Sequence, residues 1–276
     1  MIKDIVVNLS VDRPTDVAAG YAISVAEQFE AHLAAVAFAY EPVIPGTMYG
    51  GIPPEIIDAG RAEAEAIANA ALKKFDAEAE RAGISAQSHM FDATLVGGSE
   101  MFGSIARRYD LAVVGQADPD RVTQEELVIE AALFASGRPV IVVPYFQKQG
   151  LKLDRVLVAW DGSVTAARAI GDAMPFLERA GKVEVIIISE KEAKSGEVPG
   201  ADMGEHLARH GIKVEVRQIV AVDEDVANTI LSYAADFGAD FLVMGGYGHS
   251  RLREFVLGGA TRGLLEAMTV PVLMSH

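Results

Sequence analysis

One strand-and-helix pattern occurs twice along this chain, and this repeat constrains the fold more than any other feature. Short apolar runs alternate with helical patterns throughout, which is typical of βαβ units and a parallel sheet. Four pairs of segments match in the same order: 4–7 with 155–158, 81–84 with 209–212, 110–115 with 240–245, and 138–142 with 270–274. All parallel α/β strands resemble one another, but the shared order favours an internal duplication.

Five strands are expected in each half of the chain. They are predicted at 5–7, 33–38, 86–90, 111–114 and 140–143, and again at 156–159, 183–188, 214–219, 241–244 and 272–274. With helices between them, these strands predict an α/β protein of two doubly wound, five-stranded parallel-sheet domains, packed as a pseudo-twofold pair. The expected domains are residues 1–146 and 151–276, joined by a short polar segment. We expect two separate sheets rather than one continuous sheet.

The first half differs from the second by an insertion at 41–58, rich in proline and glycine. We expect a long loop there, followed by a helix over 59–82; loops of this length are often lids or contact surfaces. Gly83 and Gly211 occupy matching places at helix ends. Glycine there can adopt the left-handed cap conformation.

Composition narrows the classes of protein and partner. The 276-residue chain has no cysteine, so disulfides and thiolate metal sites are excluded. Its net charge of -15 disfavours nucleic-acid binding. The N-terminal residues lack the pattern of a signal peptide, and no apolar run reaches the roughly 20 residues that span a bilayer. We therefore expect a cytoplasmic protein with neither a nucleic-acid nor a membrane partner.

The glycine-rich stretch 245–261 carries most of the information about function. It follows an expected strand and leads into an expected helix. Gly245 and Gly248 let the chain turn sharply and bring backbone N–H groups close to a ligand. Gly258 and Gly259 stand where the next helix begins, with unpaired N–H groups and the positive end of the helix dipole. The stretch therefore predicts two backbone nests that hold a polyphosphate.

With this loop, the chain resembles the universal stress protein family in its tandem form, in which one polypeptide holds two family domains. ATP-binding members carry Gly, two residues, Gly, nine residues, and then Gly followed by Ser or Thr. Gly245, Gly248 and Gly258 have that spacing, whereas Gly259 replaces the hydroxyl residue. The resemblance implies a Rossmann-like, adenine nucleotide alpha-hydrolase-like fold in each half, with pairing between the two last strands. It does not imply a Walker A loop, and the sequence has none.

The resemblance also implies a ligand, ATP or AMP, with or without magnesium, bound in the second half. Asp161 matches the family residue that reads adenine. The expected nucleotide-binding residues are Ala159, Trp160, Asp161, Met244, Gly245, Gly248, His249, Ser250, Gly258, Gly259, Ala260 and Thr261. Simpler alternatives stay open: Asp161 could cap a helix, His249 could be a solvated loop residue, and Trp160 could belong to the core.

Gly259 weakens the expected binding without excluding it. One lost hydrogen bond to a charged group is worth about 1.5–3 kcal/mol, which is tenfold or more in affinity. Thr261, two residues further on, is expected to compensate in part.

The first half is expected to have lost this site. Asp118 stands at the place of the second loop glycine, and Glu126 and Leu127 stand at the places of the last two. A carboxylate at a phosphate position repels the ligand. Ser10 falls at the place of the adenine-reading aspartate. We predict that this half is structural and acts as a pseudo-partner of the second, with a further homodimer left open.

No catalytic group of residues stands out. The sequence has no nucleophile motif, no motif-placed pair of carboxylates and no metal-ligand spacing of histidines. The leading hypothesis is a stress-response regulatory protein that binds an adenine nucleotide. The alternatives are a nucleotide-free interaction scaffold, favoured by Gly259, and a slow ATPase. The loop glycines together with Asp161 favour the nucleotide binder.

Overall fold

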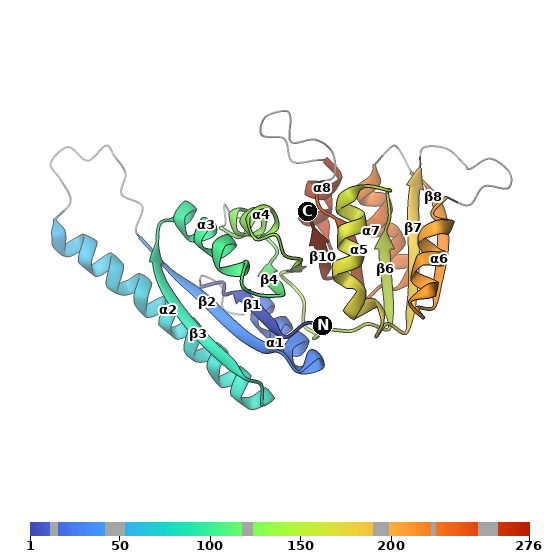
Figure 1. Cartoon of the computed structure of the whole chain (residues 1–276). Coiled ribbons are helices and arrows are strands. Elements are labelled where there is room, and N and C mark those ends of the chain that lie inside the picture. Colours follow the sequence, from blue (N-terminus) through green and yellow to red (C-terminus); the bar gives the residue numbers. More distant parts are fainter. Residues whose placement is uncertain (12–15, 42–52, 118–123, 190–198, 222–224, 248–258) are drawn as a thin grey trace.

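Two similar α/β halves lie side by side along one sheet (Figure 1). The structure is a computed structural model that describes residues 1–11, 16–41, 53–117, 124–189, 199–221, 225–247 and 259–276. The first half contains β1 (Asp4–Asn8), α1 (Val17–Phe29), β2 (His32–Tyr40), α2 (Pro54–Ala82), β3 (Ala86–Ala93), α3 (Leu95–Ala106), β4 (Leu111–Gly115), α4 (Glu125–Ala135) and β5 (Val140–Val143). The second contains β6 (Arg155–Ala159), α5 (Val164–Leu177), β7 (Lys182–Ser189), α6 (Ala201–Arg209), β8 (Val214–Val220), α7 (Val226–Phe237), β9 (Phe241–Gly245), α8 (Gly259–Ala267) and β10 (Val272–Ser275).

Both halves have the same strand order, which confirms the predicted duplication. The sheet runs β3-β2-β1-β4-β5-β10-β9-β6-β7-β8, so each half reads third, second, first, fourth, fifth strand from its outer edge inward. Pairing is parallel within each half. Each of the ten expected strands is present, with bounds that differ by a few residues at most.

The two halves meet through their last strands, as the family resemblance implied. β5 and β10 pair antiparallel, with Ile141 opposite Leu273. These two residues occupy equivalent places in the repeat, so a pseudo-twofold axis passes between them. The expectation of two separate sheets was wrong: backbone hydrogen bonding continues across this pair and gives ten strands in one sheet. An edge strand leaves unpaired N–H and C=O groups, and the pairing satisfies them on both sides.

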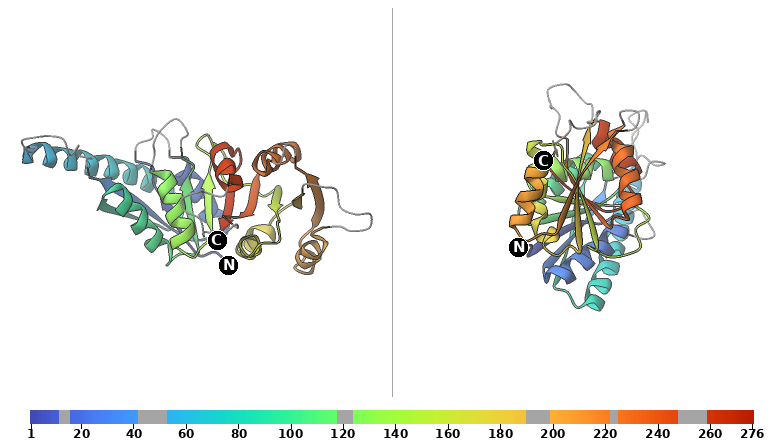
Figure 2. Two further views of the ribbon diagram at one scale, coloured as in Figure 1. Left: turned by 90° about the horizontal axis from the view of Figure 1, so that it is seen from above. Right: turned by 90° about the vertical axis from the view of Figure 1, so that its right-hand side faces the viewer.

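Helices cover both faces of the sheet, which Figure 2 shows from the end. One core cluster packs α1, α2, α5 and α6 on one face, and the other packs α3, α4, α7 and α8 on the opposite face. Alternate strand residues feed the two clusters: Ile5 and Val7 belong to the first, and Val6 belongs to the second. Strands buried on both faces read as continuous apolar runs, which explains the strong sequence signal.

Two local predictions have different outcomes. Gly83 and Gly211 have φ of +69° and +80°, which confirms the left-handed conformation at both helix ends. The long helix of the insertion begins at Pro54 rather than at residue 59, because proline is well suited to the first turn of a helix. Of the expected loop, residues 42–52 lie outside the described residues.

In the described part of the chain, no helix combines the length and apolar character needed to cross a bilayer.

Candidate functional site

Those expected nucleotide-binding residues that the structure describes lie where the strand order of the second half reverses. β6 leads through α5 to β7 on one side, whereas β9 lies on the other side and leads to α8. α5 and α8 cover opposite faces of the sheet. Ala159 and Met244 are paired neighbours at the carboxyl ends of β6 and β9. Open α/β sheets bind ligands in the crevice outside the strands at this kind of switch point.

Close packing between β9 and α5 explains the glycine at position 245. A Cβ at this position would lie 2.5 Å from the backbone nitrogen of Ala166 and 2.7 Å from Thr165 Oγ1. The first turn of α5 therefore approaches the end of β9 more closely than any side chain allows. The chain bends directly after Gly245, and among the described residues of this stretch the left-handed one is Tyr247, with φ of +54°.

The two ends of the glycine-rich loop are joined by a hydrogen bond. The backbone N–H of Tyr247 donates to Thr261 Oγ1 at 3.2 Å, and Thr261 is buried. Thr261 Oγ1 accepts this bond and its O–H can still donate, so the predicted compensation for the hydroxyl missing at 259 stays a prediction. Gly248, His249, Ser250 and Gly258 lie outside the described residues, so their predicted roles stay predictions.

Gly259 and Ala260 form the start of α8, as expected. Gly259 is exposed, and a Cβ there would meet no heavy atom within 4 Å. The position therefore has room for the hydroxyl side chain that other family members carry.

Asp161 is exposed just beyond the end of β6. Its Oδ1 accepts a hydrogen bond from the backbone N–H of Ser163 at 2.9 Å. The capping role falls to Ser163, whose Oγ accepts from the N–H of Ala166 at 3.1 Å. Ser163 therefore caps α5, and the Asp161 carboxylate is exposed beyond the end of β6, where the adenine is expected.

Trp160 lies next to the site with its ring at the edge of the core. Its backbone N–H continues the strand ladder to Ile186 O at 2.9 Å. The ring is half-buried and packs against the first core cluster, near Gly200. Trp160 therefore belongs to the core and also lies beside the candidate site.

In the first half, a buried carboxylate occupies the corresponding region. Ser10, at the place of Asp161, donates through Oγ to Glu125 Oε1 at 3.0 Å, and Glu125 is only 6% exposed. Sequence comparison had assigned the repulsive role to Glu126, but that residue points to solvent. The error is one position in a helix, which turns a side chain by about 100°. Asp118 lies outside the described residues.

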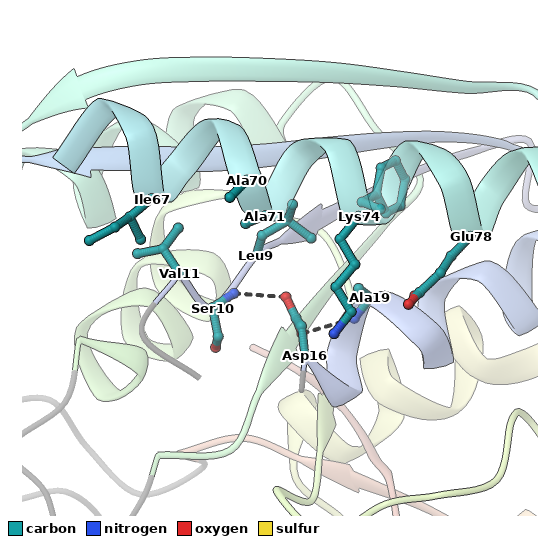
Figure 3. Close-up of a pocket in the computed structure, with 11 residues that line it drawn as sticks. Leu9, Ser10, Val11, Asp16, Ala19, Ile67, Ala70, Ala71, Lys74 and Glu78 are labelled. Atoms are coloured by element: carbon teal, nitrogen blue, oxygen red, sulfur yellow. Dashed lines mark hydrogen bonds between the residues drawn. The ribbon is translucent and has the colours of Figure 1, made fainter. Parts of the chain in front are cut away.

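The first half also contains a hollow that sequence reasoning missed, with a volume of about 260 Å³. Figure 3 shows it between α2 and the end of β1. Asp16 lies at its base and caps α1, accepting from Ser10 N at 2.8 Å and Ala19 N at 3.1 Å. Burial raises the pKa of Asp16 to about 6, against the lowering effect of these hydrogen bonds and of Lys74. An aspartate directly before an apolar helix was the available signal for this cap.

Among the described residues, no three histidine, aspartate or glutamate side chains lie close enough together to hold a metal ion.

Comparison with known sequences gives a family match for the second half of the chain. Residues 152–276 match the sequence model of the universal stress protein family. A universal stress protein of Synechocystis sp. is 28% identical over 151 residues, which covers 52% of this chain and 49% of that protein. The chain therefore spans about half the length of this curated relative.

Comparison with solved structures extends the similarity to both halves. A universal stress protein from Archaeoglobus fulgidus superposes with a TM-score of 0.71 and 19% identity, covering 99% of this chain and 95% of that chain. A functionally unknown protein from Pseudomonas aeruginosa has a TM-score of 0.62 and 16% identity, covering 99% and 92%. At these identities the similarity shows the fold.

Proposed function

The chain belongs to the universal stress protein family through its C-terminal half, and we propose that it is a stress-response regulatory protein that binds ATP or another adenine nucleotide in that half. The N-terminal half, residues 1–146, is the degenerate copy of the same domain. The proposal places adenine near Asp161 and the phosphates at the glycine-rich loop.

The observation that carries this proposal is the hydrogen bond that joins the two described ends of the glycine-rich stretch beside the sheet switch point. Tyr247 N and Thr261 Oγ1 join the ends of the loop at 3.2 Å. Gly245 holds the start of the loop against the first turn of α5. The N-termini of α5 and α8 therefore both lie near the described ends of this loop, and each presents the positive end of a helix dipole. Ser163 Oγ already accepts from one first-turn N–H of α5. Such an arrangement favours a polyphosphate despite the overall negative charge.

The scaffold alternative is favoured by Gly259, which lacks the family hydroxyl. Against it stands Asp161, whose carboxylate is exposed: it accepts from Ser163 N, while Ser163 provides the cap of α5. A slow ATPase would need a group to activate water. Sequence motifs offer none, and the proposal therefore assigns binding and no catalysis.

Purified protein analysed for bound nucleotide, followed by calorimetric titration with ATP and AMP in the presence of magnesium, tests the proposal. Gly248→Asp should abolish binding, because two unit charges about 4 Å apart repel by roughly 4 kcal/mol at an effective dielectric near 20. That energy corresponds to roughly a thousandfold loss in affinity. Trp160 fluorescence should respond to ATP in the wild-type protein and not in the variant.

Gly171→Asp is the matched control. Gly171 lies on the exposed side of α5, where a Cβ meets no atom within 4 Å, so it adds the same charge away from the loop. Binding by this control and not by Gly248→Asp supports the loop as the site. Equal affinity of Gly248→Asp and wild type excludes the loop. No binding by the wild-type protein favours the scaffold.

A further inference from the structure

The start of the glycine-rich loop is held by the other half of the chain. A Cβ at Gly246 would lie 2.7 Å from Leu133 Cδ2, so the backbone there rests directly on α4 of the first half. The next residue, Tyr247, packs its ring against Phe134 of the same helix, with centroids 4.8 Å apart and planes at 47°. Both contacts cross from the degenerate half to the half that carries the loop.

A third ring completes this contact. Phe134 meets His276 edge to face at 4.8 Å, and His276 Nδ1 lies 3.0 Å from Gly246 O. Burial, with smaller contributions from nearby Glu130 and Glu126, raises the pKa of the Tyr247 hydroxyl. The ring therefore stays neutral, which suits an apolar contact.

The reciprocal contact across the pseudo-twofold axis has a different chemistry. Gln116 follows β4 as Gly246 follows β9. Its side-chain nitrogen donates to Leu265 O at 2.8 Å and to Glu266 O at 3.2 Å, near the end of α8. The first half therefore contacts the first residues of the glycine-rich loop through α4, and it contacts α8, the helix that follows the loop, through Gln116. Glu266 stands where Phe134 stands in the first half, so that position of α8 carries no ring to make the equivalent aromatic contact.

We propose that α4 of the first half positions the start of the glycine-rich loop of the second, residues 246 and 247, with Phe134 as the positioning residue for nucleotide binding; this rests on the proposed function. Tyr247 has φ of +54° without being glycine, a conformation that persists only when its surroundings hold it. When the start of a binding loop is already fixed, less entropy is lost as a ligand arrives, and affinity rises. The first half, which is proposed to have lost its own nucleotide site, thus contributes to the site of the second half.

The test compares Phe134→Ala with Phe237→Ala in the full chain. Phe237 is the matched control. It is also half-buried and stacked on a tyrosine, Tyr233, but it is the last residue of α7 and lies away from the loop. Two quantities are measured, the affinity for ATP by calorimetry and the hydrogen exchange of peptides covering 244–262. Phe134→Ala should weaken ATP binding at least tenfold and accelerate exchange in these peptides. Phe237→Ala should change neither.

Phe134→Leu keeps the apolar bulk and should have an intermediate affinity, and it replaces Phe134→Ala if the latter does not fold. If the wild type binds ATP and all variants bind equally, the positioning role is overturned and the proposed function stands. If the wild type binds no ATP, the proposed function fails. Hydrogen exchange then decides the positioning role alone: faster loop exchange only in the Phe134 variants supports it, and unchanged exchange overturns it.

Discussion

Phe29 and Phe176 occupy equivalent positions in the two halves and touch each other across the pseudo-twofold axis. Each lies in the last turn of the first helix of its half and follows that helix's capping residue, Asp16 or Ser163, by the same interval. The ring centroids are 4.9 Å apart at 64°, an edge-to-face contact. The Arg179 guanidinium lies 4.0 Å from the Phe29 ring centroid. The halves therefore join through a helix face as well as through the β5–β10 pair.

This contact predicts a measurable coupling between the halves. In a double-mutant cycle of Phe29→Leu and Phe176→Leu, urea unfolding should give a coupling free energy of about 0.5–1.5 kcal/mol, the usual value of an aromatic pair. The control cycle pairs Phe29→Leu with Phe102→Leu, because Phe102 belongs to the core cluster on the other face of the sheet. Additive effects in the Phe29–Phe176 cycle would show that the rings do not stabilise the interface.

Gly259→Ser should strengthen nucleotide binding. The position is exposed, a Cβ meets nothing within 4 Å, and the substitution restores the hydroxyl of the family pattern. One hydrogen bond to a charged phosphate is worth about 1.5–3 kcal/mol, so the Kd should fall about tenfold or more. Calorimetry with ATP measures it, and Gly259→Ala is the control because it adds the Cβ without the hydroxyl. Equal gains from serine and alanine would assign the effect to helix propensity instead.

Nucleotide should bind once per chain. Glu125 is buried and accepts from Ser10 in the first half, so its carboxylate occupies the region that corresponds to the Asp161 crevice. A buried carboxylate disfavours an incoming polyanion. Titration calorimetry should give a stoichiometry near one for the wild type and no residual binding for Gly248→Asp. A second site that survives in that variant would contradict the asymmetry between the halves.

Asp16 should make stability decrease as pH rises toward neutrality. Its pKa in the folded protein, about 6, lies above its ordinary value of 3.8, so the folded state binds its proton more tightly than the unfolded state. The contribution is complete below about pH 4 and is lost as pH rises through 6. Between about pH 5.5 and 7.5, the free energy of unfolding of the wild type relative to Asp16→Asn should fall by about 1 kcal/mol.

The groups that share the hollow with Asp16 require a control for this measurement. Lys74 and Glu78 of α2 face the same space. Lys74→Met removes the opposing charge, so the pKa of Asp16 should rise further and the pH dependence should steepen. A difference between wild type and Asp16→Asn that does not change with pH would show that burial leaves the folded pKa ordinary.

The chain sequence by itself determined the fold of each half. Strands such as 111–114 and 241–244 are apolar on both faces, because both faces are covered by helices, and that pattern is legible without any long-range information. The left-handed conformation of Gly83 and Gly211 could also be predicted from the sequence, since it depends on local backbone geometry. The spacing of the loop glycines identified where a nucleotide is expected.

Only the tertiary structure decided how distant residues share one environment. The continuity of the sheet through Ile141 and Leu273 depends on two edges meeting, which no local pattern encodes. Glu125, not Glu126, points inward because the packing of α4 sets its rotation. Phe134 reads as an ordinary helix residue, and its contact with Tyr247 arises because the pseudo-twofold axis brings α4 against the loop of the other half. Sequence fixes such local periodicities, whereas the meeting of side chains more than a hundred residues apart follows from how the two domains pack.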